Sequence, residues 1–134
     1  MLPIIVSLPM LLTAAFDDAD DLETLLKNGA ATLEKGKTAD ALAAANKAIT
    51  AAPKDARGYF LRGNVHVALR KHKDAIADFD KCLALDSTFA NAYQSRGGEY
   101  FKLAEIDKSL ADFDRFIELR PAARPSHWQR GIAL

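Results

Sequence analysis

The sequence predicts an all-α protein, a solenoid in which antiparallel helix hairpins stack one on the next. Two observations carry this prediction. The chain repeats itself every 34 residues without a gap, and each copy contains two stretches whose apolar residues recur at the three-to-four spacing of a helix. No alternation typical of a strand follows residue 16. A single hairpin cannot cover its own apolar faces, so at least three are expected to stack.

The repeat is seen by writing the chain in rows of 34 residues that begin at Leu22, Ala56, Ala90 and Arg124. The eighth place holds one residue type throughout, at Gly29, Gly63, Gly97 and Gly131. The twentieth place is always small, at Ala41, Ala75 and Ser109. Glycine inside a helix costs ~1 kcal/mol relative to alanine, so this recurrence needs a packing reason. We expect the two helices of a hairpin to touch there, with Gly63 opposite Ala75 and Gly97 opposite Ser109.

Each row divides into two helices. Row one is the least regular copy, with the small residues Ala45 and Ala48 where larger ones are usual. Row two carries Tyr59, Gly63, His66 and Val67 on its first helix, then Ala75, Ile76, Phe79 and Leu83. Row three follows with Tyr93, Gly97, Tyr100 and Phe101, then Ser109, Leu110, Phe113 and Ile117. Polar turns separate the halves, at Lys35-Gly36-Lys37, Arg70-Lys71-His72 and Ala104-Glu105. Pro53 and Pro121 end the second helices, because proline lacks the N–H that a helix needs.

The unit resembles the tetratricopeptide repeat. It has a large residue at place four, glycine at eight, a small residue at twenty, an aromatic residue at twenty-four and proline at thirty-two. The resemblance covers three full repeats, 22–55, 56–89 and 90–123, and the start of a fourth, 124–134. It implies a right-handed superhelix with a concave face that binds proteins or peptides, within a domain that spans residues 17–134.

In that family the first helix of each repeat forms the inner wall, mainly at places two, five, nine and twelve. The resemblance therefore implies a ligand groove lined by Arg57, Phe60, Asn64, Asn91, Gln94 and Trp128. Apolar side chains and amides would together suit a peptide, since the amides can hydrogen-bond its backbone. For Asn64, a solvated side chain without a ligand is the alternative. Place twelve is usually packing, so Val67 and Phe101 are expected in the core.

Some family members hold the C-terminal carboxylate of heat-shock chaperones with a clamp of lysine, arginine and asparagine side chains. The clamp places are occupied here by Leu26, Ala30, Leu61, Asn91 and Ser95. None of these is a cation, so a terminal carboxylate would lack its charge-assisted hydrogen bonds. We do not expect a chaperone co-factor of this kind.

Arginine recurs at the seventh place, at Arg62, Arg96 and Arg130. The second helices carry matching acidic pairs, Asp78 with Asp80 and Asp112 with Asp114. An anion-binding ladder is one interpretation. We favour a structural one, in which each arginine pairs with an aspartate of a neighbouring helix and fixes the stacking register.

Neither a catalytic centre nor a metal or cofactor site is expected. His66 occupies a packing place and indicates a core histidine, His72 lies in a turn expected to be exposed, and His127 begins the last helix. No two histidines have the i,i+4 spacing of a helical metal site. The single cysteine, Cys82, excludes a disulfide within the chain and indicates a core residue.

The charge balance and the N-terminus bear on partners and location. Lysine plus arginine and aspartate plus glutamate both number 18, which argues against nucleic acid and against a polybasic membrane surface. Residues 1–16 carry no charged side chain and end near Thr13-Ala14-Ala15. This predicts a signal peptide cleaved near Ala15 and an exported protein, periplasmic or secreted. No basic residue precedes the apolar stretch, so a misassigned start, a buried N-terminal segment in a cytoplasmic protein and an uncleaved anchor stay open.

A second class of function is a homotypic assembly module. Trp128, Ile132 and Leu134 fall on the first helix of the fourth row, and a repeat array normally needs a polar capping helix. The chain is then a fragment of a longer protein, or these residues cover the open end, or they pair with another copy.

Overall fold

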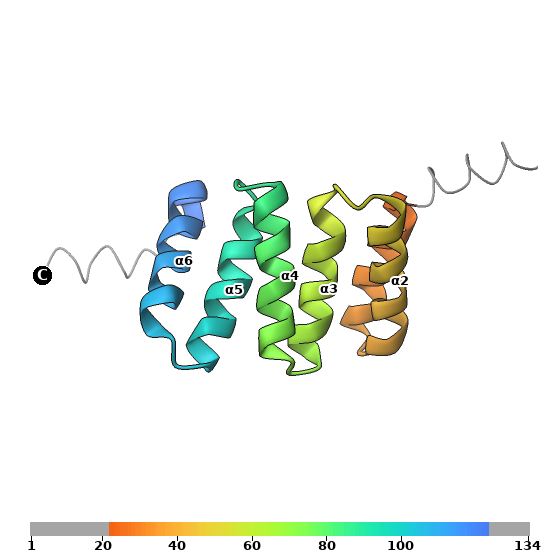
Figure 1. Ribbon diagram of the computed structural model, residues 1–134, viewed down its shortest axis with the longest axis horizontal. Coiled ribbons are helices and arrows are strands. Elements are labelled where there is room, and N and C mark those ends of the chain that lie inside the picture. Colours follow the sequence, from red (N-terminus) through yellow and green to blue (C-terminus); the bar gives the residue numbers. More distant parts are fainter. Residues whose placement is uncertain (1–21, 124–134) are drawn as a thin grey trace, which may run out of the picture.

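The computed structural model describes residues 22–123, which form a row of α-helices in chain order (Figure 1). A first helix over residues 22–34 is followed by α2 (Thr38–Ala51), α3 (Ala56–Ala68), α4 (His72–Leu85), α5 (Ala90–Lys102) and α6 (Ile106–Leu119). A short 3-10 helix, η1 (Pro121–Ala123), follows. No strand occurs between residues 22 and 123. The predicted all-α solenoid of helix hairpins is therefore confirmed.

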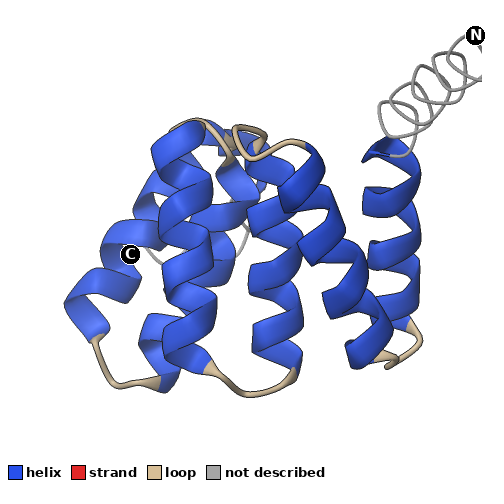
Figure 2. Cartoon of the chain, turned by 45° about the vertical axis from the view of Figure 1, so that its right-hand side comes forward, coloured by secondary structure: helices blue, strands red, loops and turns tan. Residues whose placement is uncertain are grey.

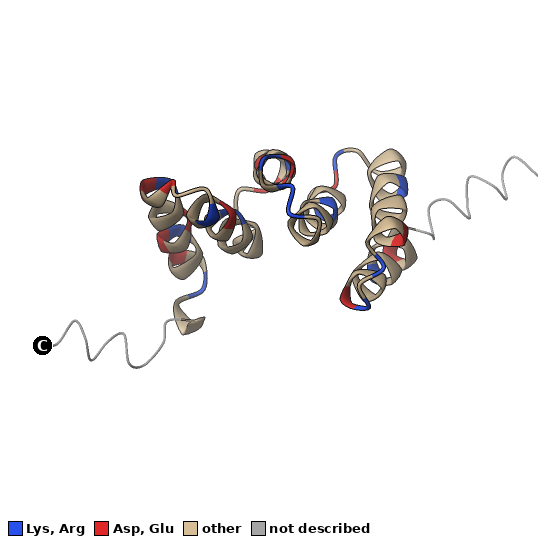
Figure 3. Cartoon of the chain, turned by 90° about the horizontal axis from the view of Figure 1, so that it is seen from below, with Lys and Arg blue, Asp and Glu red and all other residues tan. Residues whose placement is uncertain are grey.

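The helices pack in sequence order as antiparallel pairs joined by short loops (Figure 2). Among α2 to α6, the α3–α4 and α5–α6 pairs make the most extensive contacts, and α2 with α3 and α4 with α5 join neighbouring hairpins. α3 and α5 also touch each other directly. Seen from below, α3 and α5 lie on one side of the arc and α4 lies on the other (Figure 3). The first helices of the repeats thus form an inner layer.

The turn inside each hairpin bends through one left-handed residue at the fifteenth place of the row. These residues are Gly36, Arg70 and Ala104, with φ of 79°, 58° and 61°. Only glycine adopts this region without a steric cost, so the second and third repeats hold a strained backbone that the polar composition of the turns did not reveal. The turns also end earlier than expected, since His72 is already the first residue of α4.

The recurring glycines are close contacts between helices. A Cβ atom at Gly63 would lie 2.5 Å from Cε1 of Phe79, and one at Gly97 would lie 3.1 Å from Cε1 of Phe113. The aromatic residue at place twenty-four therefore supplies the nearest atoms to Gly63. At Gly97 the predicted contact with Ser109 is also formed, since the Ser109 hydroxyl donates to the carbonyl oxygen of Gly97 at 2.8 Å.

Gly29 shows how the irregular first repeat fills the same space. Its aromatic place holds the small residue Ala45, and a Cβ atom at Gly29 would meet Cδ2 of Leu61 at 2.6 Å and Cβ of Ala44 at 3.2 Å. Leu61 belongs to the next repeat and is buried. A contact between repeats thus supplements the contact with α2 of the same hairpin. Gly131 lies outside the described residues.

Small residues at place twenty let each hairpin close. Ala41 and Ala75 are fully buried, and Ser109 is 2% exposed. Between repeats, the hydroxyl of Tyr59 donates to the carbonyl oxygen of Pro53 at 3.2 Å, and that of Tyr93 donates to the carbonyl oxygen of Ser87 at 3.0 Å. These equivalent bonds join each first helix to the end of the preceding repeat.

Cys82 is fully buried in the cluster between the second and third repeats. Burial, with smaller contributions from the charges of Asp86 and Asp55, raises the pKa of its thiol to about 12. The thiolate is the reactive species, so we expect no alkylation by iodoacetamide in the native protein at pH 8 and rapid alkylation in 8 M urea. Mass spectrometry measures both; rapid native labelling would contradict the packing.

Among residues 22–123, no helix is long and apolar enough to cross a membrane, and no group of three or more potential metal ligands is found. The apolar leader, residues 1–16, lies outside the described residues, as do His127, Trp128 and Arg130.

Candidate functional site

The inner face formed by α3 and α5 carries most of the residues expected in a ligand groove. Arg57, Phe60 and Asn64 come from α3, and Asn91 and Gln94 come from α5. The side chains of Arg57, Asn91 and Gln94 are exposed, and those of Phe60 and Asn64 are half-buried. Trp128, the remaining expected groove residue, is outside the described part of the chain.

Three amide side chains on this face have unused hydrogen-bonding groups. Asn64, Asn91 and Gln94 make no side-chain hydrogen bond to another residue of the 22–123 segment, unlike Asn46 on α2, which accepts from Arg62. Gly98 occupies place nine in the third repeat, and a Cβ atom built there would meet nothing within 4 Å. This stretch of the inner face is therefore open and able to hydrogen-bond.

Phe60 forms the apolar part of the face. Its ring centroid lies 4.8 Å from that of Phe89 and 5.9 Å from that of Phe79. Tilted aromatic pairs at these distances are favourable, so the ring is held in place. It can present one exposed surface to a ligand while the other surface belongs to the core.

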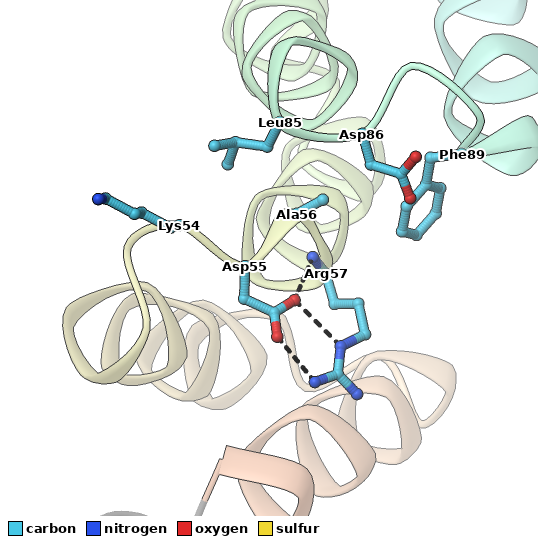
Figure 4. A pocket seen from close by; sticks show the side chains of 7 residues that line it. All are labelled: Lys54, Asp55, Ala56, Arg57, Leu85, Asp86 and Phe89. Atoms are coloured by element: carbon cyan, nitrogen blue, oxygen red, sulfur yellow. Dashed lines mark hydrogen bonds and ion pairs between the residues drawn. The ribbon is translucent and has the colours of Figure 1, made fainter.

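Arg57 was expected to contact a ligand, and its guanidinium is already occupied. Nη1 lies 2.7 Å from Oε1 of Glu23, and Nη2 lies 2.7 Å from Oδ2 of Asp55. The hydrogen bonds that Arg57 donates to Asp55 and, second, to Glu23 raise the pKa of Arg57 above its ordinary value. Figure 4 shows Arg57 and Asp55 beside Phe89 at the mouth of a small pocket. Glu23 and Arg57 stand at the same place in successive repeats, so this pair joins two repeats.

Asp55 caps α3 by accepting hydrogen bonds from the backbone N–H and the side chain of Arg57. The hydrogen bond from the Arg57 side chain is the largest influence on the Asp55 carboxyl and lowers the pKa of Asp55 below its ordinary value. A carboxyl group whose pKa is lower in the folded state stabilises the fold at pH values above its unfolded-state pKa. This stabilisation is lost as the pH falls through its folded-state pKa. We therefore expect the urea concentration at the unfolding midpoint of the wild type to decrease as the pH is lowered below about 4. Asp55→Asn should remove part of this pH dependence. Identical pH profiles would contradict this.

The side chains at place twelve are more exposed than the sequence predicted. Phe101, expected in the core, is 63% exposed, and Val67 is only half-buried. Both lie in the last turn of a first helix, where the chain is about to reverse and the second helix no longer covers the side chain. The apolar surface of the groove is therefore larger than predicted and extends to the turn end.

The predicted arginine–aspartate pairing is confirmed. Arg62 binds Asp78 through two parallel hydrogen bonds of 2.9 and 2.8 Å, and Arg96 binds Asp112 through bonds of 2.8 and 2.7 Å. Nη1 of Arg96 also donates to Asp80 of the preceding repeat at 2.8 Å. Arg62 and Arg96 thus each fix their own hairpin and contact the second helix of the preceding repeat, which leaves them unavailable as an anion ladder.

The histidines take part in packing and ion pairing. His66 is mostly buried, as expected, with Nε2 3.4 Å from Oδ2 of Asp78. His72 is half-buried and not exposed, because Nδ1 lies 2.5 Å from Oε2 of Glu99. Glu99 is 1% exposed and also accepts from Lys102 at 2.7 Å. Glu99 was not among the residues predicted from the sequence; the available signal was a glutamate at the place that holds Val65 in the second repeat.

Two family models, both described as tetratricopeptide repeat, match residues 26–88 and 90–122. The chain belongs to the tetratricopeptide-repeat family. The resemblance drawn from the register of glycine, small and aromatic residues is thus confirmed, and the groove described above lies on the helices that form the inner layer of this repeat array.

Solved tetratricopeptide structures share the fold. The crystal structure of MamA matches with a TM-score of 0.71 at 25% identity, over 83% of this chain and 65% of that one. The first TPR of Spaghetti (RPAP3), bound to the HSP90 peptide SRMEEVD, matches at 0.73 and 25% over 76% and 81%. The TPR2B domain of yeast Sti1, in a complex with pHsp70, matches at 0.72 and 26% over 77% and 82%. This chain spans less than two thirds of the MamA chain. No curated protein matches the sequence significantly.

Proposed function

We propose that this protein is a non-catalytic scaffold that binds a protein or peptide segment along the inner face of α3 and α5. The observation that carries the proposal is the row of unused amides, Asn64, Asn91 and Gln94, beside the open surface at Gly98. Amides can donate to and accept from a peptide backbone, and the exposed surface of Phe60 supplies an apolar contact. The peptide complexes of the RPAP3 and Sti1 repeats support this use of the fold.

The partner is not expected to be held by a basic carboxylate clamp. The clamp places carry no cation, and the packing explains one of them, because Leu61 is 6% exposed and covers Gly29. A cation at that place could not occupy the same position without leaving a buried charge. The recognition chemistry therefore differs from that of a terminal carboxylate held at those places.

The test is capture of a partner by the immobilised protein from cell and envelope extracts, followed by titration calorimetry of the identified partner. We expect Asn64→Ala with Gln94→Ala to weaken binding about tenfold or more, because each lost hydrogen bond leaves a partner group unpaired. Lys47→Ala on α2 is the matched control, since Lys47 is exposed on an outer helix. Equal affinity of the double variant and the wild type would contradict the groove assignment.

Homotypic assembly is the alternative function. Ile106 and Leu110 of α6 are 45% and 56% exposed, which is an apolar surface that a second copy would cover. Size-exclusion chromatography with light scattering distinguishes the two functions: a concentration-dependent dimer that Leu110→Glu abolishes would favour assembly, and a monomer at all concentrations would count against it.

We also propose, from residues 1–16 alone, that the protein is exported. N-terminal sequencing of the protein purified from the envelope fraction tests this. A mature chain that begins near residue 16 is the expected result, and recovery of the intact leader in the cytosol would contradict it.

A further inference from the structure

A second concave site lies at the turn end of the inner face. Val67 and Ala68 of α3, Arg70 of the following turn, His72 of α4 and Lys102 of α5 line a pocket of about 390 Å³. Three of the five residues carry or can carry a positive charge, and the other two are apolar. None of the groove amides lines the pocket, and Asn64, the nearest of them in sequence, lies one helical turn before Val67.

The positive charges of this pocket are only partly neutralised by the surrounding residues, and Arg70 is the one without an acidic partner among residues 22–123. His72 and Lys102 share one carboxylate, that of Glu99, which is buried beneath them. Arg70 forms no ion pair with any residue between 22 and 123. Lys71 and Lys73 are exposed beside it, and Asp74 is the one acidic residue of this turn. Figure 3 looks onto this end of the molecule, where the turn between α3 and α4 is basic.

An exposed aromatic residue that is not part of the pocket lining stands one position before Lys102 on α5. Phe101 directly precedes Lys102, holds the place on α5 that Val67 holds on α3, and is 63% exposed. A large aromatic side chain next to an ammonium group suits a ligand that carries an acidic and an apolar group in neighbouring positions.

We propose that this pocket binds an acidic side chain of the partner segment, with an adjacent large apolar residue of that segment packed on Phe101. The inference rests on the proposed function and adds the chemistry of the partner. Arg70 and Lys102 would donate to the carboxylate, and His72, held by Glu99, would form the wall. Charge-assisted hydrogen bonds of this kind are roughly twice as strong as neutral ones.

The shape and the local charge favour a peptide over a membrane or a nucleic acid. This end of the molecule carries both signs of charge, because Lys35 and Lys37 are exposed at the preceding hairpin turn and Glu105 and Asp107 are exposed at the next one. A lipid surface or a duplex would meet both signs of charge, whereas one acidic side chain would meet only the pocket.

The left-handed residue supplies a variant that removes charge without loss of stability. Arg70 has φ of 58° and Ala104, its counterpart in the third repeat, has φ of 61°. Glycine suits both positions, so Arg70→Gly is expected to fold at least as well as the wild type. Ala104→Gly makes the same backbone change without a change of charge and is the matched control.

The probe is a fluorescein-labelled, end-blocked octapeptide of alternating glutamate and leucine, with the glutamine–leucine peptide as its neutral counterpart, titrated by fluorescence anisotropy. We expect the acidic peptide to bind the wild type and Ala104→Gly with equal affinity, and to bind Arg70→Gly about tenfold more weakly. The affinity of the wild type for the glutamine peptide should be as low as that of Arg70→Gly for the acidic peptide. Phe101→Ala should weaken the glutamate–leucine peptide and leave a glutamate–serine peptide unchanged.

Three results would overturn the proposal: equal binding of the acidic peptide to Arg70→Gly and Ala104→Gly, equal binding of the two peptides by the wild type, or no binding of the acidic peptide at about 1 mM. Arg70-dependent binding of phosphatidylserine vesicles without peptide binding would assign the pocket to a membrane and also overturn it. A natural partner that depends on Asn64 and Gln94 but not on Arg70 would leave the groove function intact.

Discussion

Gly63→Ala is expected to destabilise the protein by about 1–3 kcal/mol, although alanine is the better helix former. The added methyl group would lie 2.5 Å from Cε1 of Phe79, which is fully buried and cannot move into solvent. The ring or the two helices must shift, and the cost of overpacking exceeds the gain in helix propensity. The measurement is the free energy of unfolding from urea denaturation followed by circular dichroism at 222 nm.

Gly98→Ala is the matched control for that prediction. Gly98 is in the same kind of helix, one residue after the repeating glycine of the third repeat, and an added Cβ atom meets nothing within 4 Å. We expect this variant to be more stable than the wild type by about 0.5–1 kcal/mol. If both alanines stabilised the protein, the close contact at Gly63 would not exist in solution.

Arg96→Ala is expected to cost about 3–5 kcal/mol, which is the usual penalty for removing one partner of a buried ion pair. Asp112 is 5% exposed and accepts both parallel hydrogen bonds from Arg96. Hydrogen bonding to Asp112 raises the pKa of Arg96 above its ordinary value, in the direction expected for a guanidinium held by a carboxylate. Without the arginine, the buried carboxylate of Asp112 would lose the donor of both hydrogen bonds.

Arg115→Ala separates burial from charge as the cause. Arg115 pairs with Glu118 at 3.0 Å on the surface of α6, where the side chains are 44% and 64% exposed. Surface pairs of this kind contribute about 0–1 kcal/mol, so thermal unfolding should change little. A loss in Arg115→Ala as large as that in Arg96→Ala would show that overall charge, and not the Arg96–Asp112 contact, sets the stability.

The repeat could be predicted from the sequence because it depends on residues of a given size at fixed spacing. Glycine at place eight and small residues at place twenty are required wherever two helices approach closely, and proline at place thirty-two ends a helix in any context. The arginine–aspartate register was predictable for the same reason, since both partners recur with the period of the repeat. What the sequence by itself determined is thus the fold, its repeating contacts and the helices that carry the groove.

Only the tertiary structure decided how the groove residues are used. Arg57 was expected to face a ligand and is held by Asp55 and Glu23, whereas Phe101 was expected in the core and is exposed. The basic pocket brings together residues of α3, α4 and α5 that are up to 35 positions apart. Its buried Glu99 breaks the repeat pattern, so no period predicts it. A residue's place in a repeat fixes the direction of its side chain, but its exposure and partners depend on non-repeating neighbours from other helices.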